Sequence, residues 1–281
     1  MIAHSKPRSF LALTFVLSMI CALIMPSNIA NAGLTIFPLK IVMEERERFT
    51  EINIFNMGKT KNSYKIAWRF QKQKPSGVYE NIDSTLTPEL DLSKQMVFTP
   101  RRVTLQPNGR QTVRLAVRRS GDVPAGEYRA HLLIQSFEEE ANKNTPENSL
   151  ETQGANTIVK VMPGYTIPII YRVGAYDAAV TIDNVRFDPE SNGKKLLLDL
   201  NRSGAHGTVG NLRAYHLVAG KDPVQVGLKN NINIFTENTT REASIQMTKT
   251  GFSGGQLHIV YNGEGPQKGV VLAETYIPLA N

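Results

Sequence analysis

The sequence has few of the residues on which metal, redox and cofactor chemistry depend. Its 281 residues include one cysteine, Cys21, and one tryptophan, and aromatic residues make up 7% of the chain. A single cysteine can form neither an intramolecular disulfide nor a multi-thiolate metal site. Beyond residue 32, no apolar run approaches the ~18 residues that a membrane-spanning helix needs.

Sequence motifs of catalysis are also absent. There is no G-x-S-x-G, H-E-x-x-H or phosphate-loop pattern. The histidines beyond residue 32 do not follow metal-ligand spacing, and we interpret them as exposed or strand-surface residues: His131, His206, His216 and His258. The acidic run Glu138–Glu140 is interpreted as a solvated loop entrance rather than a cation site. We therefore expect neither an enzyme nor a bound cofactor or metal.

The first 32 residues have the features of a secretory signal peptide. Lys6 and Arg8 precede a mostly apolar run at 10–25, and Ala30-Asn31-Ala32 is a small-residue cleavage pattern. The alternative is an N-terminal membrane anchor. Cleavage after Ala32 predicts an exported protein that begins at Gly33, and in a Gram-negative cell its compartment is the periplasm.

Removal of this segment changes the chain in three ways. It leaves 249 residues, lowers the formal net charge from +7 to +5 because Lys6 and Arg8 are lost, and removes the only cysteine. A chain of this length can bury a core large enough to fold without disulfides. The small basic excess lacks the interleaved aromatic residues of single-strand binders, so no nucleic-acid partner is expected.

Apolar residues recur at every second position along almost the whole chain. Segment 128–137 places Tyr128, Ala130, Leu132 and Ile134 on one face, and Asn-Met-Gly, Pro-Ser-Gly and Pro-Ala-Gly sequences separate such segments. Short alternating strands with regular turn signals predict an all-β protein made of sandwich or barrel domains. A boundary near Tyr171–Gly174 divides it into 33–172 and 173–281, each the size of an immunoglobulin-like domain.

The segment at 98–119 is unusually rich in arginine for a half-buried strand. Val113, Leu115 and Val117 alternate with Arg114 and Arg118, which predicts one apolar face and one basic face. We interpret these arginines as charges that favour solubility and protect the sheet from pairing with other chains. Attraction of an acidic partner is the alternative.

Four segments in order resemble one family. They are "FPLKIVM" at 37–43, "FTPRRVTLQPNGRQTVRL" at 98–115, "GEYRAHLLI" at 126–134 and "IPIIYR" at 167–172. Together with the signal peptide, they make the chain similar to the periplasmic pilus-assembly chaperones of the PapD-like family, as a divergent long-loop member. The second-domain segment 201–215 resembles part of that family as well.

The resemblance implies two immunoglobulin-like β-sandwich domains with a cleft between them. It also implies a function. Family members bind pilus or fimbrial subunits that lack one strand, complete them with a strand of their own, and deliver them to an outer-membrane usher. Such donor-strand complementation is strand addition to an exposed sheet edge. The alternative is a two-domain periplasmic binding or structural protein that does not deliver subunits.

The resemblance also nominates residues. The lending strand would include Val159, Val161 and Pro163, whose parity continues through Tyr165, Ile167 and Ile169. From the residues alone, an ordinary core strand is the alternative. Lys40 falls where the family has an arginine that anchors the subunit carboxylate, but it lacks that residue's two-pronged donor geometry. Pro168 stands where the family has a second anchoring cation.

A further pair is carried over from the junction between the family's domains. Glu127 and Arg172 match an ion pair there, and no second-domain aspartate matching the rest of that network is evident. The departures at Lys40, Pro168 and this aspartate favour a divergent branch of the family.

Overall fold

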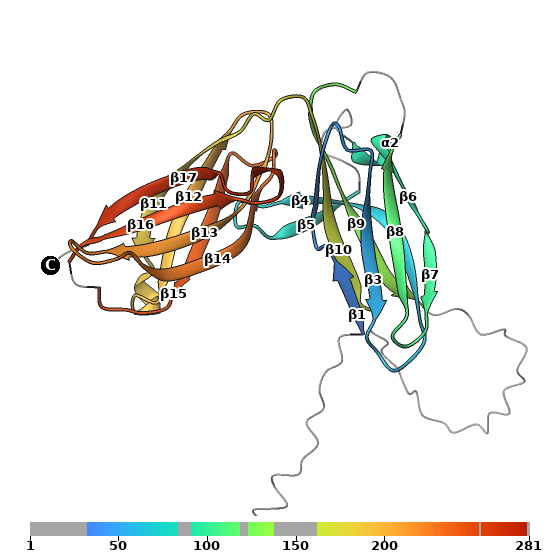
Figure 1. Ribbon diagram of the computed structural model, residues 1–281, viewed down its shortest axis with the longest axis horizontal. Coiled ribbons are helices and arrows are strands. Elements are labelled where there is room, and N and C mark those ends of the chain that lie inside the picture. The colour runs from blue at the N-terminus through green and yellow to red at the C-terminus, as the bar shows by residue number, and fades with distance from the viewer. Residues whose placement is uncertain (1–32, 84–90, 119–122, 138–161, 253, 280–281) are drawn as a thin grey trace, which may run out of the picture.

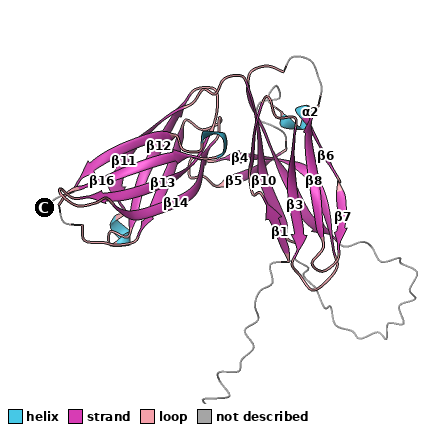
Figure 2. Ribbon diagram, in the orientation of Figure 1, coloured by secondary structure: helices cyan, strands magenta, loops and turns pink. Residues whose placement is uncertain are grey.

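A computed structural model describes residues 33–83, 91–118, 123–137, 162–252 and 254–279. Strands account for most of these residues, and they form two bodies that meet at an angle (Figures 1 and 2). The expectation of an all-β protein is confirmed. We call the body containing β1–β10 the first domain and that containing β11–β17 the second domain.

The first domain is a sandwich of two sheets. One sheet has the strand order β1-β3-β8-β6, and the other has β2-β10-β9-β4-β5 with β7 paired to β4. The bounds are β1 Leu34–Phe37, β2 Ile41–Glu44, β3 Phe49–Asn56, β4 Asn62–Gln73, β5 Tyr79–Ile82, β6 Met96–Thr99, β7 Arg102–Leu105, β8 Arg110–Val117, β9 Gly126–Phe137 and β10 Gly164–Val173. A short helix, α2 (Leu92–Gln95), is capped by the Asp91 side chain, which accepts from the Ser93 amide.

The first edge of this sandwich changes sheets partway along. β1 pairs antiparallel with β3, and after residues 38–40 the chain continues as β2, which pairs parallel with β10. The crossing leaves Phe37 and Leu39 each 69% exposed. β2 therefore pairs with only the C-terminal part of β10 and leaves the edge of its N-terminal part uncovered.

The core of the first domain follows the period-two pattern. Tyr128, Ala130, Leu132 and Ile134 all lie in it, as the alternation predicts. His131 was interpreted from the sequence as an exposed or strand-surface residue, and this is wrong because its side chain is buried. His206 and His216 are buried as well, which corrects their interpretation as exposed histidines.

The second domain is a single seven-stranded antiparallel sheet, with the order β11-β12-β15-β14-β13-β16-β17. Between β14 and β15 only Gly227–Met247 and Leu228–Gln246 pair, and β11 contacts β17, so the sheet folds over on itself around one core. The bounds are β11 Ala179–Phe187, β12 Lys195–Ser203, β13 Thr208–Leu217, β14 Val224–Ile234, β15 Thr240–Met247, β16 Gln256–Gly263 and β17 Val271–Pro278, with 3-10 helices η2 Pro189–Ser191 and η3 Gly265–Gln267.

Neighbouring side chains balance part of the arginine-rich surface of β8. Arg114 Nη2 lies 3.1 Å from Glu51 Oε1 on β3, and its guanidinium carbon lies 5.3 Å from the centre of the Phe49 ring. Both members of the ion pair are well exposed to solvent. Such pairs contribute ~0–1 kcal/mol, so this pair adds little to folding stability. Among the described residues, no helix is both long and apolar enough to cross a membrane.

Tyr128 gives the first domain a feature of immunoglobulin-like sandwiches. It lies near the start of β9, is fully buried, and its hydroxyl donates to the carbonyl oxygen of Pro124 at 2.8 Å. A tyrosine at this corner that bonds to the backbone a few residues upstream is typical of these domains.

We predict that Tyr128→Phe lowers the free energy of unfolding by about 1 kcal/mol, because a carbonyl loses its donor while packing is kept. The nearby Tyr171→Phe is a matched control, since the Tyr171 hydroxyl makes a long contact of 3.4 Å with the Glu45 carbonyl oxygen. Urea unfolding of both variants measures the difference. A larger loss from Tyr171→Phe would contradict the prediction.

Candidate functional site

The second edge of β10 is free along its first half in the described part of the chain. β10 pairs with β9 over its full length, from Gly164 to Val173, but with β2 only from Ile169 to Arg172. The stretch Gly164–Pro168 therefore has one paired edge and one open edge. A row of unpaired backbone groups of this kind can pair with a strand from another chain.

The pairing with β9 determines which backbone groups point outward. The Ser136 amide donates to the Pro163 carbonyl at 3.1 Å, so odd-numbered residues of β10 bond to β9. The amides and carbonyls of Gly164 and Thr166 then point to the open edge. Pro168 falls in the same outward set, where its missing N–H removes no bond to β9.

The side chains of β10 change from exposed to buried along the strand. Ile167 and Ile169 share the parity of Pro163 and Tyr165, but both isoleucines are buried in the core of the first domain. That face of β10 is therefore a core face toward its C-terminal end. Pro163 and Tyr165 are exposed. Val159 and Val161 lie outside the described residues, and their part in a lending strand stays a prediction.

Lys40 lies at the end of the open edge and contacts the second domain. It precedes Ile41, the partner of Ile169. Its ammonium bonds to oxygens of Asn231 at 3.0 Å, Asn233 at 3.3 Å and Glu264 at 3.0 Å. Sequence reasoning nominated Lys40, but nothing in the sequence pointed to acceptors about 190 residues or more away.

Burial of the Lys40 side chain changes its titration. Burial lowers the pKa of Lys40, and the hydrogen bond and charge of Glu264 oppose this shift. The pKa of Glu264 is lowered, because hydrogen bonds from Lys40 and Asn211 and the Lys40 charge outweigh the effect of burial. The lowered pKa of Glu264 favours its carboxylate form, whereas the lowered pKa of Lys40 works against its ammonium form, which the contact with Glu264 helps to retain.

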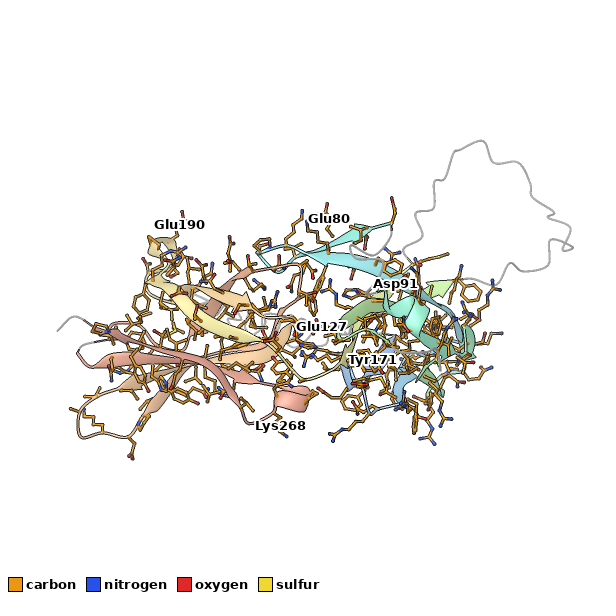
Figure 3. All side chains as sticks on the ribbon, turned by 90° about the horizontal axis from the view of Figure 1, so that it is seen from above. Glu80, Asp91, Glu127, Tyr171, Glu190 and Lys268 are labelled. Carbon is orange, nitrogen blue, oxygen red and sulfur yellow. The ribbon has the colours of Figure 1, made fainter. Side chains whose placement is uncertain are left out.

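Glu127 lies where the two domains meet (Figure 3). Its side chain is in direct contact with that of Arg172. Arg172 Nε lies 3.1 Å from Glu127 Oε2, and both side chains are 1% exposed. The other two guanidinium nitrogens donate to the second domain, to Gln267 Oε1 and to the Gly207 carbonyl oxygen, each at 2.7 Å. The planar fork of arginine therefore joins three acceptors from separate segments.

Gly207 completes this network from the second domain. Its amide donates to Glu127 Oε2 at 2.9 Å, and a side-chain carbon at this position would approach Glu127 Oε1 to 2.7 Å. Only glycine allows the backbone this close. Gln267 and Gly207 are thus the second-domain partners of Arg172, and neither was expected from sequence.

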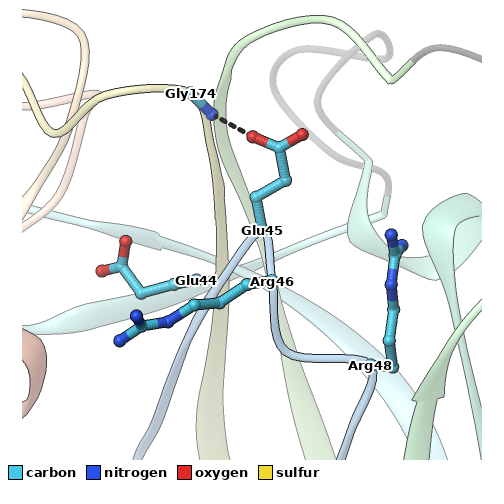
Figure 4. Close-up of a pocket in the computed structure, with 5 residues that line it drawn as sticks. All are labelled: Glu44, Glu45, Arg46, Arg48 and Gly174. Carbon is cyan, nitrogen blue, oxygen red and sulfur yellow. Dashed lines mark hydrogen bonds between the residues drawn. The ribbon is translucent and has the colours of Figure 1, made fainter.

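The loop between β2 and β3 contacts the start of the connection between the two domains. Glu45 Oε2 accepts from the Gly174 amide at 3.0 Å (Figure 4). With Glu44, Arg46 and Arg48 these residues line an open pocket of about 570 Å³. No group of three or more potential metal-ligating acidic, histidine or cysteine residues occurs among the described positions.

We predict strong coupling between Glu127 and Arg172. Removing one partner of a buried ion pair leaves an uncompensated charge, at a cost of about 3–5 kcal/mol. Glu127→Gln and Arg172→Met should each destabilise the protein strongly, and the double variant should lose less than their sum. A double-mutant cycle from chemical denaturation measures the coupling. The same cycle on Glu51 and Arg114 is the exposed control, with ~0–1 kcal/mol expected. Equal coupling at both sites would contradict the prediction.

His131 makes the first domain sensitive to acid. Burial, and to a lesser extent the charge of Arg129, lowers the pKa of His131 to about 3. Both ring nitrogens are buried without a hydrogen-bond partner among the described residues. Arg69 lies opposite His131 on β4, and the Tyr79 ring contacts it from β5. The folded protein therefore favours neutral histidine.

The unfolded chain takes up this proton near pH 6.5, so stability falls as pH drops from about 6.5 towards 3. At pH 4 we expect His131 alone to account for roughly 3 kcal/mol of lost stability. His131→Leu should reduce the loss in unfolding free energy between pH 7 and pH 4 by that order. Parallel denaturation series at the two pH values test this. An identical acid loss in variant and wild type would show that His131 is not the sensitive group.

No family model matches the chain, and no curated protein matches it. Solved structures do resemble it. One is the class 5 fimbriae chaperone CfaA, at 17% identity over 88% of this chain and 100% of that one, with a TM-score of 0.44.

Two others are also chaperones. The complex of CsuC with the CsuE subunit from Acinetobacter baumannii matches at 15% identity over 89% of this chain and 99% of that one, with a TM-score of 0.44. The periplasmic chaperone SfaE matches at 10% identity over 87% and 98%, with a TM-score of 0.40.

Proposed function

We propose that this protein is a periplasmic chaperone that binds pilus or fimbrial subunits by strand addition along β10 and delivers them to an outer-membrane usher. The observation that carries the proposal is the open edge at Gly164–Pro168, beside exposed Phe37 and Leu39. It combines unpaired backbone groups with apolar surface, which are the two features needed to pair with an incomplete β-domain.

The described edge is too short to supply the whole interface. Gly164 and Thr166 offer two outward amides, and Pro168 offers only a carbonyl. The five residues span roughly 13 Å at the usual rise of a strand. A lending strand would therefore continue into the preceding residues, where Val159 and Val161 are the candidate side chains for a subunit groove.

Lys40 would receive the carboxylate of the subunit. It follows Leu39 at the far end of the open edge, and its ammonium already binds one carboxylate, that of Glu264. The family anchors the subunit carboxylate with two cations. Here Lys40 stands at the position of the first, and Pro168 replaces the second. The signal peptide at 1–32 and the proposed pilus or fimbrial subunits both fit a periplasmic location. The proposal includes neither a cofactor nor a nucleic acid.

A substitution that removes one outward amide tests strand addition. Thr166→Pro deletes an N–H that points to the open edge and spares the bonds to β9. Thr166→Ala keeps the amide and is the matched control. After co-expression with a pilus or fimbrial subunit, we expect pull-down by Thr166→Pro to fall at least tenfold, and pull-down by Thr166→Ala to stay near wild type.

Melting curves of both free variants establish that each is folded. Equal capture by Thr166→Pro and wild type would contradict strand addition at this edge. If wild type captures no subunit at all, the alternative is favoured: a two-domain binding or structural protein that does not deliver subunits.

A further inference from the structure

A second set of contacts joins the domains away from the linker. The hairpin of β4 and β5 meets the turn at 235–239, which connects β14 to β15. Figure 1 shows β4 and β5 reaching from the first domain towards the second. No sequence motif indicated these contacts, and the Glu127–Arg172 pair is not part of them.

The 235–239 turn is held rigid from within the second domain. Arg202 is buried, and its guanidinium donates to the carbonyls of Asn238 at 3.2 Å and Thr236 at 3.1 Å. It also donates to the carbonyls of Gly204 and His206. Because one planar group holds both sides of the turn, side chains of the turn are presented in a fixed orientation.

Two polar side chains of the turn bond to the hairpin. Glu237 Oε1 accepts from the backbone amide of Gln73 at 2.8 Å and from Arg129 Nη2 at 2.6 Å. Asn238 Nδ2 donates to the backbone oxygen of Gln73 at 2.9 Å and to its side-chain oxygen at 3.2 Å. Arg129 and Glu237 are 13% and 10% exposed, so this ion pair is largely shielded from water.

An apolar contact lies beneath these bonds. The Phe235 ring is fully buried, with the Arg129 guanidinium carbon 3.8 Å from its centre and the Tyr79 ring centre 6.1 Å away. Phe235 also clusters with Val209 of its own domain and with Ile170 of β10. The turn is thus seated in the outer face of the six-stranded sheet.

The tip of the hairpin makes a third contact. The Pro75 carbonyl accepts from the Glu242 amide at 2.9 Å and from Arg241 Nη1 at 3.2 Å. The Arg241 guanidinium also lies where a side chain at Gly77 would be, and Gly77 has a φ of +84°. Only glycine combines this backbone conformation with the close approach.

The order of the strands shows how widely the contacts between the domains are spread across the sheet. Across the sheet β2-β10-β9-β4-β5, the second domain contacts Lys40 beside β2, Arg172 on β10, Arg129 on β9 and Gln73 on β4. These contacts extend over three strand spacings, or about 14 Å. A contact at one point allows rotation about it, whereas contacts across the width of a sheet oppose rotation.

We infer that Gln73, Arg129, Glu237 and Asn238 are positioning residues that fix the orientation of the second domain, with the β4–β5 hairpin acting as a strut. Domains joined by a short linker move relative to each other unless their interface prevents it. The inference concerns orientation alone and does not rest on the proposed function.

Distances between spin labels on the two domains test the inference. Labels at Arg110→Cys and Lys221→Cys, both exposed positions, are introduced into the chain carrying Cys21→Ser. Glu237→Ala removes the acceptor for Gln73 and Arg129, and we expect it to widen the distance distribution at least twofold. Glu237→Gln keeps an acceptor oxygen and should give an intermediate width.

The matched control is Glu80→Ala, which removes a carboxylate from the same hairpin. Glu80 pairs with Lys74 at 3.4 Å on an exposed surface, so its loss should leave the distribution unchanged. Asn238→Ala, which loses only its bonds to Gln73, is the second test variant if Glu237→Ala does not fold. Near-ultraviolet spectra show that each variant is folded.

A Glu237→Ala or Asn238→Ala variant that folds and keeps the wild-type distribution would overturn the inference. Equal widening by Glu80→Ala would also overturn it, because the effect would then follow from any lost hairpin charge. A distribution that widens while the spectra stay native is the result expected of a positioning role, since a general loss of structure would change both.

Discussion

The buried guanidinium of Arg172 is the constraint on which the arrangement of the domains depends. A cation removed from water is costly unless it is paired and hydrogen-bonded. Glu127 supplies the opposite charge from the neighbouring strand, but it satisfies only one face of the fork. The remaining donors reach Gly207 and Gln267, which belong to the second domain. In the first domain alone these donors would have only water as a partner. Arg172 on β10 therefore favours contact with the second domain.

This constraint also explains why β10 is paired on both edges near its C-terminal end and on only one edge near its N-terminal end. At Ile169–Arg172 the strand lies between β9 and β2, and its outer face is covered by the second domain. Nearer Gly164 neither β2 nor the Arg172 network reaches it. The rigid half fixes the direction and register of the open half, and a strand fixed in this way loses less entropy when it pairs with a partner.

Some of this could be predicted from sequence. Period two identified the core face of β9, and similarity to known motifs nominated Glu127 and Arg172. Alternation, however, shows only that a strand has two faces and does not reveal what covers the second one. Arg129 and His131 look like residues of a wet face, yet Phe235 and Tyr79 cover that face. Their partners, which come from both domains, lie about 50 to 108 residues away, and no local pattern encodes these contacts.

The same limit applies to Lys40, and here the structure changes what the proposed function requires. An ammonium has three donors, and Asn231, Asn233 and Glu264 already accept from all of them. An incoming carboxylate must therefore replace an acceptor. An amide oxygen is a weaker acceptor than a carboxylate, and Asn231 is the more exposed of the two asparagines. The lowest-cost exchange releases Asn231 and keeps Glu264. Lys40 would then bind two carboxylates, that of Glu264 and that of the subunit. Binding of the subunit carboxylate would therefore depend on the contact between Lys40 and the second domain.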